Sequence, residues 1–284
     1  MPYLLTIFTP TYNRAHTLPI LFESLKKQTS KNFEWLIVDD GSLDTTKDLV
    51  EEFKKESDFS IRCIFQNNQG KHIAINNGVE NAKGKYFVIV DSDDFLLENA
   101  TKVMEELTQK IDSIENIGGF TYIHFQKNTP YKIEDFGKKQ WFQDEKYDWK
   151  FPGEMQYVYK IEVLKKFPFP QFPGEKFCPE SLIHHQIGNH YKVLYTDNVL
   201  ASGEYQQDGL SSNFAQLMEK NPKTAMLFYS QKLKSKEFDK ETKRVYTKNY
   251  WNIALKAKHI SWFQKFLGIS FSHSFWFWKN RILK

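Results

Sequence analysis

Short apolar runs alternate with amphipathic stretches through the first third of the chain. Each run is too short for a helix and rich in β-branched and aromatic residues, which predicts buried strands over Tyr3–Phe8, Phe33–Val38, Ile61–Phe65 and Tyr86–Val90. Between the strands, apolar residues recur at helical spacing. The first predicted helix begins with Thr17 as its cap and Pro19 in its first turn. The alternation predicts an α/β fold with a mostly parallel central sheet and right-handed crossovers.

A polar loop follows each predicted strand directly. The four loops read TPTYNR, DDGS, NNQGK and DSDD. In an open parallel sheet, ligands bind outside the carboxyl ends of the strands. We therefore expect the four loops to converge on one crevice.

The last loop places Asp91, Asp93 and Asp94 within four residues. Mutual repulsion makes such a cluster costly unless a cation shares it. Mg²⁺ and Mn²⁺ prefer carboxylate oxygens, and Mg²⁺ is usually held by one or two carboxylates together with substrate phosphates. The cluster predicts a divalent cation and a diphosphate ligand. The alternative is a helix start, with Asp94 or Ser92 capping a helix that begins near Glu98.

Composition places the chain among globular proteins. It has 284 residues, of which 40% are hydrophobic and 26% charged, enough for one large or two small domains. Cys63 and Cys178 lie far apart and indicate neither a disulfide framework nor a zinc site, so a reducing cytoplasm is the default. The N-terminal residues run directly into a predicted strand, so we expect no signal peptide, and the sequence has no apolar run long enough to span a bilayer.

The net charge of +4 is unevenly distributed. Residues 216–284 carry 15 Lys/Arg against 4 Asp/Glu, whereas residues 1–215 carry 24 against 31. This asymmetry suggests an anionic partner for the tail, either nucleic acid or a membrane surface.

The segments TPTYNR, WLIVDDGS, NNQGKHIAINNGVENAKGKY and DSDD resemble family 2 glycosyltransferases of GT-A fold, of the bacterial capsule and surface-polysaccharide type. The similarity is close over residues 3–108 and weaker to residue 213. It implies a nucleotide-sugar-binding half over residues 1–110 and an acceptor-binding, catalytic half over 111–215. Residues 216–284 would form a basic, aromatic, helical extension. The implied reaction is metal-dependent, inverting transfer from a UDP-sugar to a carbohydrate hydroxyl, on a lipid-linked oligosaccharide at the cytoplasmic membrane face.

The resemblance also implies roles for the first two loops. The Thr-Pro-x-Tyr loop, with Pro10 and Tyr12, would touch the uracil, and Asp40 would bind the base. Chemistry agrees, since aromatic rings stack on bases and a carboxylate accepts from an imide N–H. The alternatives are a lid role for Tyr12 and a cap role for Asp39 on the next helix.

The third and fourth loops would hold the diphosphate and the metal. Family members often read Ala-Arg-Asn-x-Gly where this chain has Ala-Ile-Asn-Asn-Gly at residues 74–78. Lys71 would supply the missing positive charge near the diphosphate, or is simply solvated. By the family pattern Asp91 lies in the ribose, sugar and metal region and Asp93 ligates Mn²⁺ or Mg²⁺. Asp94 is either a cap or a second candidate for the general base.

FPGEKFCPES resembles the segment where family members place a catalytic carboxylate at the start of a helix. Glu180 would be the general base, although a favourable charge on the helix dipole after Pro179 explains it too. His184 and His185 would contact acceptor or metal, or lie on the surface. Asp208 would replace a family histidine that completes metal coordination, or form a simple turn with the next glycine.

Two aromatic segments remain. Trp141, Phe142, Tyr147 and Trp149 would stack on sugar rings or anchor a loop. Residues 261–284 hold eight aromatics and four Lys/Arg without an acidic residue. A stripe of Phe271, Phe275, Trp278 and Ile282 would either pack on the protein or, with the remaining aromatics, lie on an anionic membrane as an in-plane helix. No base-reading motif accompanies the charge, so nucleic acid is not expected.

Other functions need other features. A dehydrogenase would show G-x-G-x-x-G, and a sugar-nucleotide pyrophosphorylase would need a Gly-rich, basic first loop; the chain has neither. A non-catalytic membrane or nucleic-acid adaptor on the same fold stays open, because a fold does not prove a function.

Overall fold

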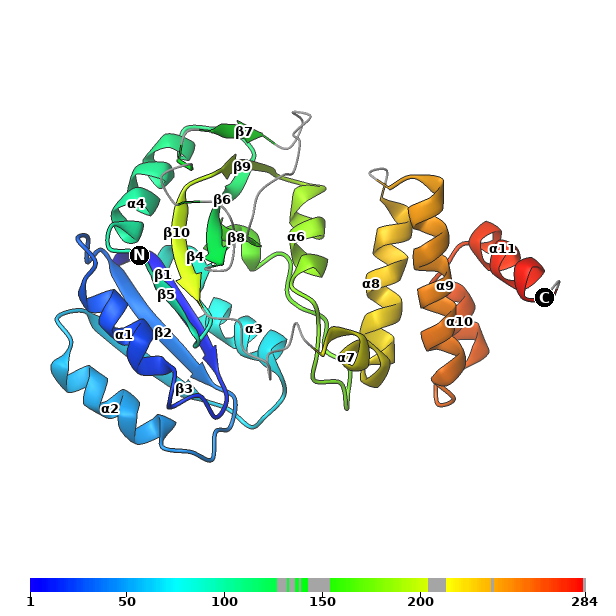
Figure 1. Ribbon diagram of the computed structural model, residues 1–284, viewed down its shortest axis with the longest axis horizontal. Coiled ribbons are helices and arrows are strands. Elements are labelled where there is room, and N and C mark those ends of the chain that lie inside the picture. The colour runs from blue at the N-terminus through cyan, green and yellow to red at the C-terminus, as the bar shows by residue number, and fades with distance from the viewer. Residues whose placement is uncertain are drawn as a thin grey trace. The chain divides into compact units, whose positions relative to one another are not determined.

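The computed structural model divides the chain into two compact units (Figure 1). The first comprises residues Met1–Phe169 and Ile183–Gln207, and the second Pro170–Leu182 and Asp208–Lys284. The structure describes residues 1–126, 132, 136–137, 139–142, 154–203, 213–235 and 238–282.

Four parallel strands form the part of the sheet that the apolar runs predict. They are β1 (Tyr3–Thr11), β2 (Phe33–Asp39), β3 (Ser60–Phe65) and β4 (Gly84–Ile89), ordered β3-β2-β1-β4. The connecting helices are α1 (Leu18–Lys26), α2 (Thr46–Glu56) and α3 (Lys71–Asn81). These elements confirm the predicted alternation of strand and helix.

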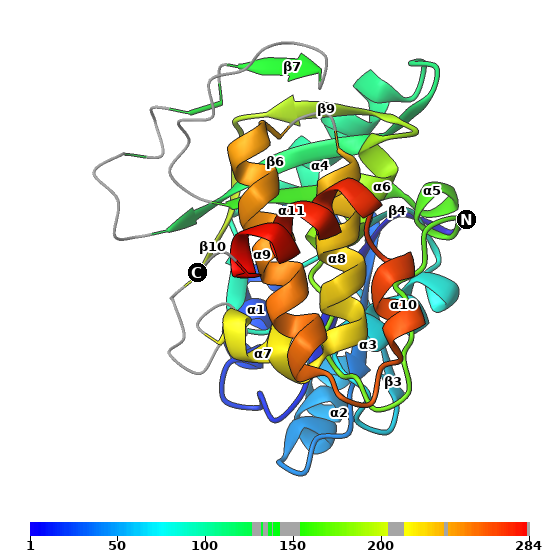
Figure 2. The ribbon, with the colours of Figure 1, turned by 90° about the vertical axis from the view of Figure 1, so that its right-hand side faces the viewer.

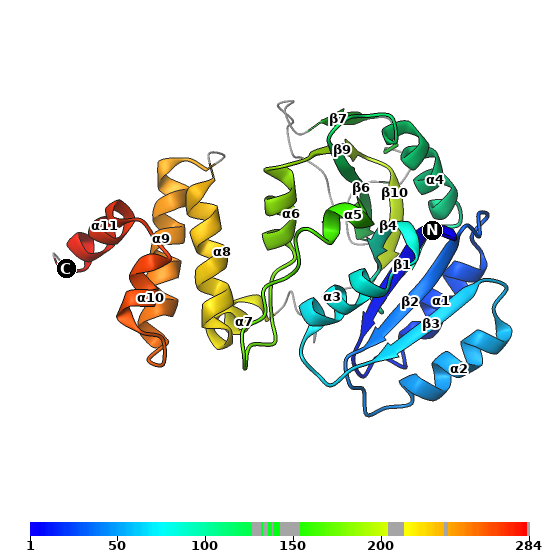
Figure 3. The same cartoon turned by 180° about the vertical axis from the view of Figure 1, so that it is seen from behind.

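Helices cover both faces of these strands. On one face, the rings of Phe22 from α1 and Phe53 from α2 stack 4.1 Å apart, against Trp35 of β2. On the other face, α3 approaches Phe8 of β1 so closely that a Cβ at Gly78 would lie 2.2 Å from its ring. Helix α1 accordingly lies in front of the strands in Figure 1 and behind them in Figure 3. Burial of both faces explains why these strands are continuous apolar runs.

The rest of the sheet mixes strand directions. Strand β8 (Glu154–Lys160) runs antiparallel between β4 and β6 (Ile117–Gln126). Strand β10 (Val199–Gly203) runs parallel to β6 and antiparallel to β5 (Asp94–Leu96). The other elements are β7 (Gln140–Phe142), β9 (Lys192–Thr196), α4 (Ala100–Ile111), α5 (Ile161–Leu164) and α6 (Ser181–Gly188). One sheet holds strands from both residues 1–110 and residues 111–215. The predicted division of the chain into a nucleotide-sugar-binding half and an acceptor-binding half at residue 110 therefore stays a prediction.

The helix-cap interpretation of the Asp cluster is wrong. Asp94 begins β5, opposite Gly203 of β10. Helix α4 begins only at Ala100, after Asn99, and no side chain caps it. The Asp94 carboxylate is therefore not used by a helix N-terminus.

The second unit is helical, as predicted for the extension. Its helices are α7 (Phe214–Lys220), α8 (Pro222–Lys234), α9 (Lys240–Lys256), α10 (Trp262–Leu267) and α11 (Phe271–Ile282). Helices α8 and α9 lie side by side and α11 crosses α9 (Figure 2). Trp251 of α9 is fully buried at the centre and stacks on Phe277 of α11 at 5.8 Å.

The predicted packing stripe of α11 is wrong for Phe271 and Phe275, whereas its member Trp278 is partly buried against the core around Trp251. Phe271 and Phe275 are 83% and 59% exposed, whereas Ser274 and Phe277 are buried. The helix thus packs on a different side from the one that spacing suggested. No helix among the described residues is both long and apolar enough to cross a bilayer.

Candidate active site

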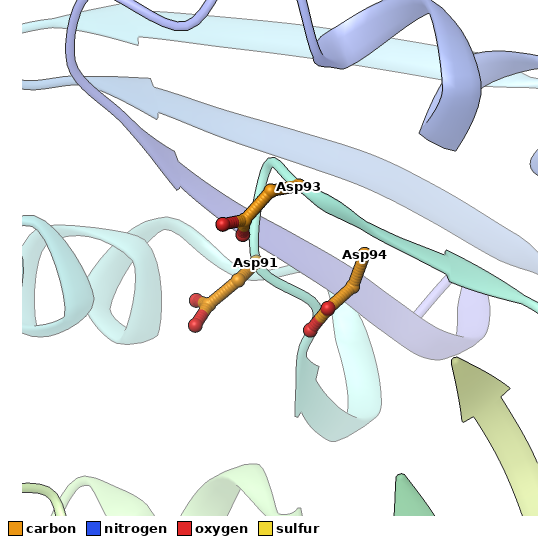
Figure 4. A group of neighbouring side chains, drawn as sticks. All are labelled: Asp91, Asp93 and Asp94. Carbon is orange, nitrogen blue, oxygen red and sulfur yellow. The ribbon is translucent and has the colours of Figure 1, made fainter. Parts of the chain in front are cut away.

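Three carboxylates gather in the loop that follows β4. One carboxylate oxygen from each of Asp91, Asp93 and Asp94 lies within 4.8 Å of the other two, and all three residues are half-buried. Figure 4 shows their carboxylates on the same side of the turn. No other group of three or more potential metal ligands occurs in the described ranges. The predicted cluster is therefore assembled in space as well as in sequence.

The electrostatics of the cluster fit a divalent cation. Burial, reinforced by the charge of Asp91, raises the pKa of the Asp93 carboxyl above its usual range. Burial also raises the pKa of Asp94, although the hydrogen bond to His124 opposes that shift. Groups that are desolvated and share like charge gain most from a bound cation. Since the donors are all hard oxygens, Mg²⁺ or Mn²⁺ suits them.

Lys71 lies beside this cluster. It is the first residue of α3, after Gly70, whose φ of +99° favours glycine. Its ammonium nitrogen is 2.7 Å from the Asp91 carboxylate. Lys71 is therefore ion-paired with the Asp cluster rather than merely solvated, and its role near a diphosphate stays a prediction.

Asp40 is buried and connects the loop after β2 to the loop after β3 by hydrogen bonds. Its carboxylate accepts 2.8 Å hydrogen bonds from the Gln66 side chain and from the backbone N–H groups of Gln69 and Gly70. A carboxylate has about four acceptor positions, so these three bonds leave one unused, and the role of Asp40 in binding the base stays a prediction. Asp39 instead accepts from the Ser42 N–H at 2.9 Å, within its own loop, so its predicted cap role is wrong.

The first loop presents Tyr12. Pro10 is buried in β1, while Tyr12 follows the strand and is exposed. The next residue, Asn13, is held by the second loop: its N–H donates to the Ser42 hydroxyl and its side chain accepts from the Leu43 N–H, both at 2.8 Å. Two loops from adjacent strands therefore form one rim, from which the Tyr12 ring is accessible for stacking.

His124 is a site residue that the sequence analysis missed. Its Nε2 lies 2.8 Å from Oδ1 of Asp94, which joins β6 to the start of β5. Gly203 of β10 makes room for the pair, because a Cβ there would lie 2.1 Å from that Asp94 oxygen. The signal in the sequence was a histidine in a largely apolar strand, and that is not specific.

The remaining predicted residues come from other segments of the chain. Glu180 is half-buried, directly precedes α6 and belongs to the second unit, so its role as general base stays a prediction. His184 packs on β8, with its ring 3.9 Å from that of Tyr157 and its Nδ1 3.2 Å from the Tyr159 hydroxyl. His185 is half-buried.

Trp141 is buried and stacks on Tyr195 at 5.7 Å, and Phe142 is partly buried against the core, which supports the anchoring role for both. Asp208, Tyr147 and Trp149 lie outside the described residues.

Comparison with known proteins agrees with this geometry. The family model for glycosyl transferase family 2 matches residues 6–169, more than half of the chain. The chain belongs to glycosyl transferase family 2. The pyrophosphorylase interpretation is thereby set aside, and the predicted GT-A fold is confirmed by the solved structures that the chain resembles.

Two curated relatives show how far this family similarity extends. The glycosyltransferase GlyG of Streptococcus pneumoniae is 28% identical over 196 residues, covering 65% of each chain. A GalNAc(5)-diNAcBac-PP-undecaprenol beta-1,3-glucosyltransferase of Campylobacter jejuni is 28% identical over 208 residues, covering 69% of this chain and 66% of that one. The chain thus spans about two thirds of the length of these relatives.

Solved structures support the fold alone. TarS of S. aureus in complex with UDP-GlcNAc has a TM-score of 0.61 at 17% identity, covering 89% of this chain and 73% of that one. The mannosyltransferase PcManGT of Pyrobaculum calidifontis, in complex with GDP-Man and Mn²⁺, has a TM-score of 0.57 at 15% identity, covering 98% and 79%.

Proposed function

We propose that this protein is a metal-dependent, inverting glycosyltransferase that moves a sugar from a UDP-sugar to a carbohydrate hydroxyl. The observation that carries the proposal is the Asp cluster at the carboxyl end of β4, with the Lys71 ammonium held against it. This arrangement suits a cation and a diphosphate at the place where parallel sheets bind ligands.

The donor side of the site is built from the four loops. Tyr12 stacks on the uracil, and Asp40 offers its remaining acceptor position to the imide N–H. Asp93 and Asp91 would hold Mg²⁺ or Mn²⁺; Asp208, the further ligand expected from the sequence, lies outside the described residues. Lys71 donates to a diphosphate oxygen. The bound cation would neutralise charge on the departing diphosphate.

Chemistry at the acceptor needs a base. Glu180 removes the proton of the acceptor hydroxyl, and the hydroxyl oxygen attacks the anomeric carbon as the bond to the diphosphate breaks, with inversion. Asp94 is the second candidate for the general base that accepts this proton. Its hydrogen bond to His124 holds its carboxylate in place.

The proposed acceptor is a lipid-linked oligosaccharide in bacterial surface-glycan synthesis. The Campylobacter jejuni relative is named for an undecaprenol-linked diphosphate substrate, and a relative from Staphylococcus epidermidis is named a teichoic acid poly(glycerol phosphate) polymerase. An anionic membrane surface, contacted through residues 261–284, would be a further partner. This would place the protein peripherally on the inner face of the plasma membrane.

A thermal-shift panel of nucleotide sugars, each with and without Mn²⁺, tests the donor assignment. Ligand that binds the native state raises the unfolding temperature by mass action. We expect stabilisation by a UDP-sugar that depends on Mn²⁺ and is lost in Asp93→Asn. A non-catalytic adaptor on the same fold would show no nucleotide-dependent metal binding.

A further inference from the structure

The second unit exposes large apolar side chains in one short stretch. Among the described residues, six large hydrophobic side chains between residues 262 and 275 are exposed, namely Trp262, Phe263, Phe266, Leu267, Phe271 and Phe275. Among the other described residues of that unit, the exposed large hydrophobic side chains are Phe214 and Val245. Scattered single apolar residues are normal on a surface, but a concentrated group marks an interaction site.

The burial pattern of helix α10 is the reverse of that of a surface helix in a water-soluble protein. Its charged residue, Lys265, is 4% exposed and lies 5.0 Å from the centre of the Trp262 ring. Its apolar residues Phe263 and Leu267 are 72% and 70% exposed. A helix that turns its lysine inward and its apolar side chains outward loses free energy in water. The same arrangement is favourable where the outer side meets an apolar medium.

This orientation is fixed by the packing of the unit. The Tyr250 hydroxyl donates to the Lys265 carbonyl at 2.6 Å, and Ser261 and Gln264 form a capping box at the start of α10. On either side of α10, Ile260 and Ile269 are buried in the same core as Trp251. Rotation of α10 to bury its apolar side chains would break these contacts.

The surrounding charge has one sign. Residues 242–284 contain nine Lys/Arg and no Asp or Glu. Of those that the structure describes, six are exposed: Arg244, Lys248, Lys256, Lys258, Lys279 and Arg281. A second copy of this basic segment would be repelled, whereas a surface of anionic lipid headgroups over an apolar layer matches both the charge and the aromatic side chains.

We propose that the exposed apolar side chains of α10 (Trp262, Phe263, Phe266 and Leu267) and of the start of α11 (Phe271 and Phe275) insert into the headgroup region of an anionic membrane. The proposal deepens the proposed function, because it assigns the membrane contact to particular side chains. It replaces the predicted stripe: Phe271 and Phe275 keep a membrane role, while Phe277 packs inside the protein. The exposed lysines and arginines would add electrostatic attraction to the apolar contact.

Point variants of the full chain test this face better than deletion, since removing residues 261–284 would strip Ile269 and Phe277 from the core around Trp251. The test variant is Phe263→Ser with Leu267→Ser. The control is Ile20→Ser with Val245→Ser, which removes two exposed apolar side chains elsewhere. Sedimentation is measured with vesicles of phosphatidylcholine alone and with phosphatidylglycerol added, at low and high salt.

We expect the wild-type protein and the control to sediment with phosphatidylglycerol vesicles, and added salt to weaken the binding. The α10 variant should bind at least about tenfold more weakly, because interfacial binding scales with buried apolar area. Its thermal shift with UDP-sugar and Mn²⁺ should match the wild type, which separates this proposal from the donor assignment. Equal vesicle binding by the α10 variant would overturn the proposal. So would wild-type protein that binds no vesicles, or a self-association that the α10 variant abolishes without changing vesicle binding.

Discussion

Substitution of Gly203 by alanine tests how the site holds Asp94. The added Cβ would lie 2.1 Å from Asp94 Oδ1 and 3.1 Å from His124 Nε2, whereas real Cβ contacts stay beyond 3.0 Å. The carboxylate must therefore retreat by about 0.9 Å, the difference between 3.0 and 2.1 Å. The 2.8 Å bond to His124 would not survive such a shift.

The magnitude follows from two effects. Overpacking costs about 1–3 kcal/mol, and replacement of a glycine returns roughly 0.4–1 kcal/mol by reducing the entropy of the unfolded chain. We expect a net destabilisation of about 0–2.5 kcal/mol, with the fold retained. Misplacement of a site group by about 1 Å costs as much as 10²-fold in rate, so turnover should fall about 10–100-fold.

The assay combines urea unfolding, initial transfer rates and Mn²⁺-dependent stabilisation by the UDP-sugar. Gly118→Ala is the matched control, since its Cβ would meet Tyr191 at 3.0 Å, away from the carboxylates. It should lower stability without loss of Mn²⁺ dependence. In a double variant with His124→Ala, the Gly203→Ala effect on the rate should shrink, because both changes remove one interaction. Gly203→Ala with wild-type rate and Mn²⁺ response would refute the reasoning.

Three further predictions concern single groups. Asp93→Asn should abolish Mn²⁺-dependent transfer and raise the unfolding temperature of the metal-free protein, because it removes a half-buried charge that Asp91 repels; undiminished wild-type activity in excess chelator would contradict the metal assignment. Glu180→Gln should keep donor binding and lose roughly 10²-fold or more in turnover, the scale of a general base; normal turnover would point to Asp94. Burial raises the pKa of Cys63 and of Cys178 to about 12. At pH 8 iodoacetamide should therefore alkylate both about 10³-fold more slowly than a free thiol, and rapid labelling of native protein would disprove their burial.

The sequence alone was sufficient to predict the first half of the sheet and the edge at which its polar loops meet. The four apolar runs and their intervening helices are local patterns, and the carboxyl ends of parallel strands must lie at one edge. Asp91 and Asp93 could be recognised for that reason, since they lie in one loop of a few residues. Lys71 was also within reach of sequence reasoning, because Gly70 and the start of α3 place it beside the same edge.

Contacts between distant segments needed the tertiary structure. The Asp94–His124 bond joins two residues that are 30 apart in sequence, and it depends on Gly203 from a third strand. The local sequence could not tell whether Asp94 begins a strand or caps a helix, because short polar segments are compatible with both. The pairing of β5 with β10 decided it.

The tail shows the same limit for helices. Aromatic residues occur on several sides of α11, so spacing alone could not tell which side packs inward. Contacts with Trp251 of α9 selected Phe277 and left Phe271 and Phe275 outside. Sequence determined that the tail is basic, aromatic and helical, whereas packing between helices decided which of its aromatic side chains face solvent.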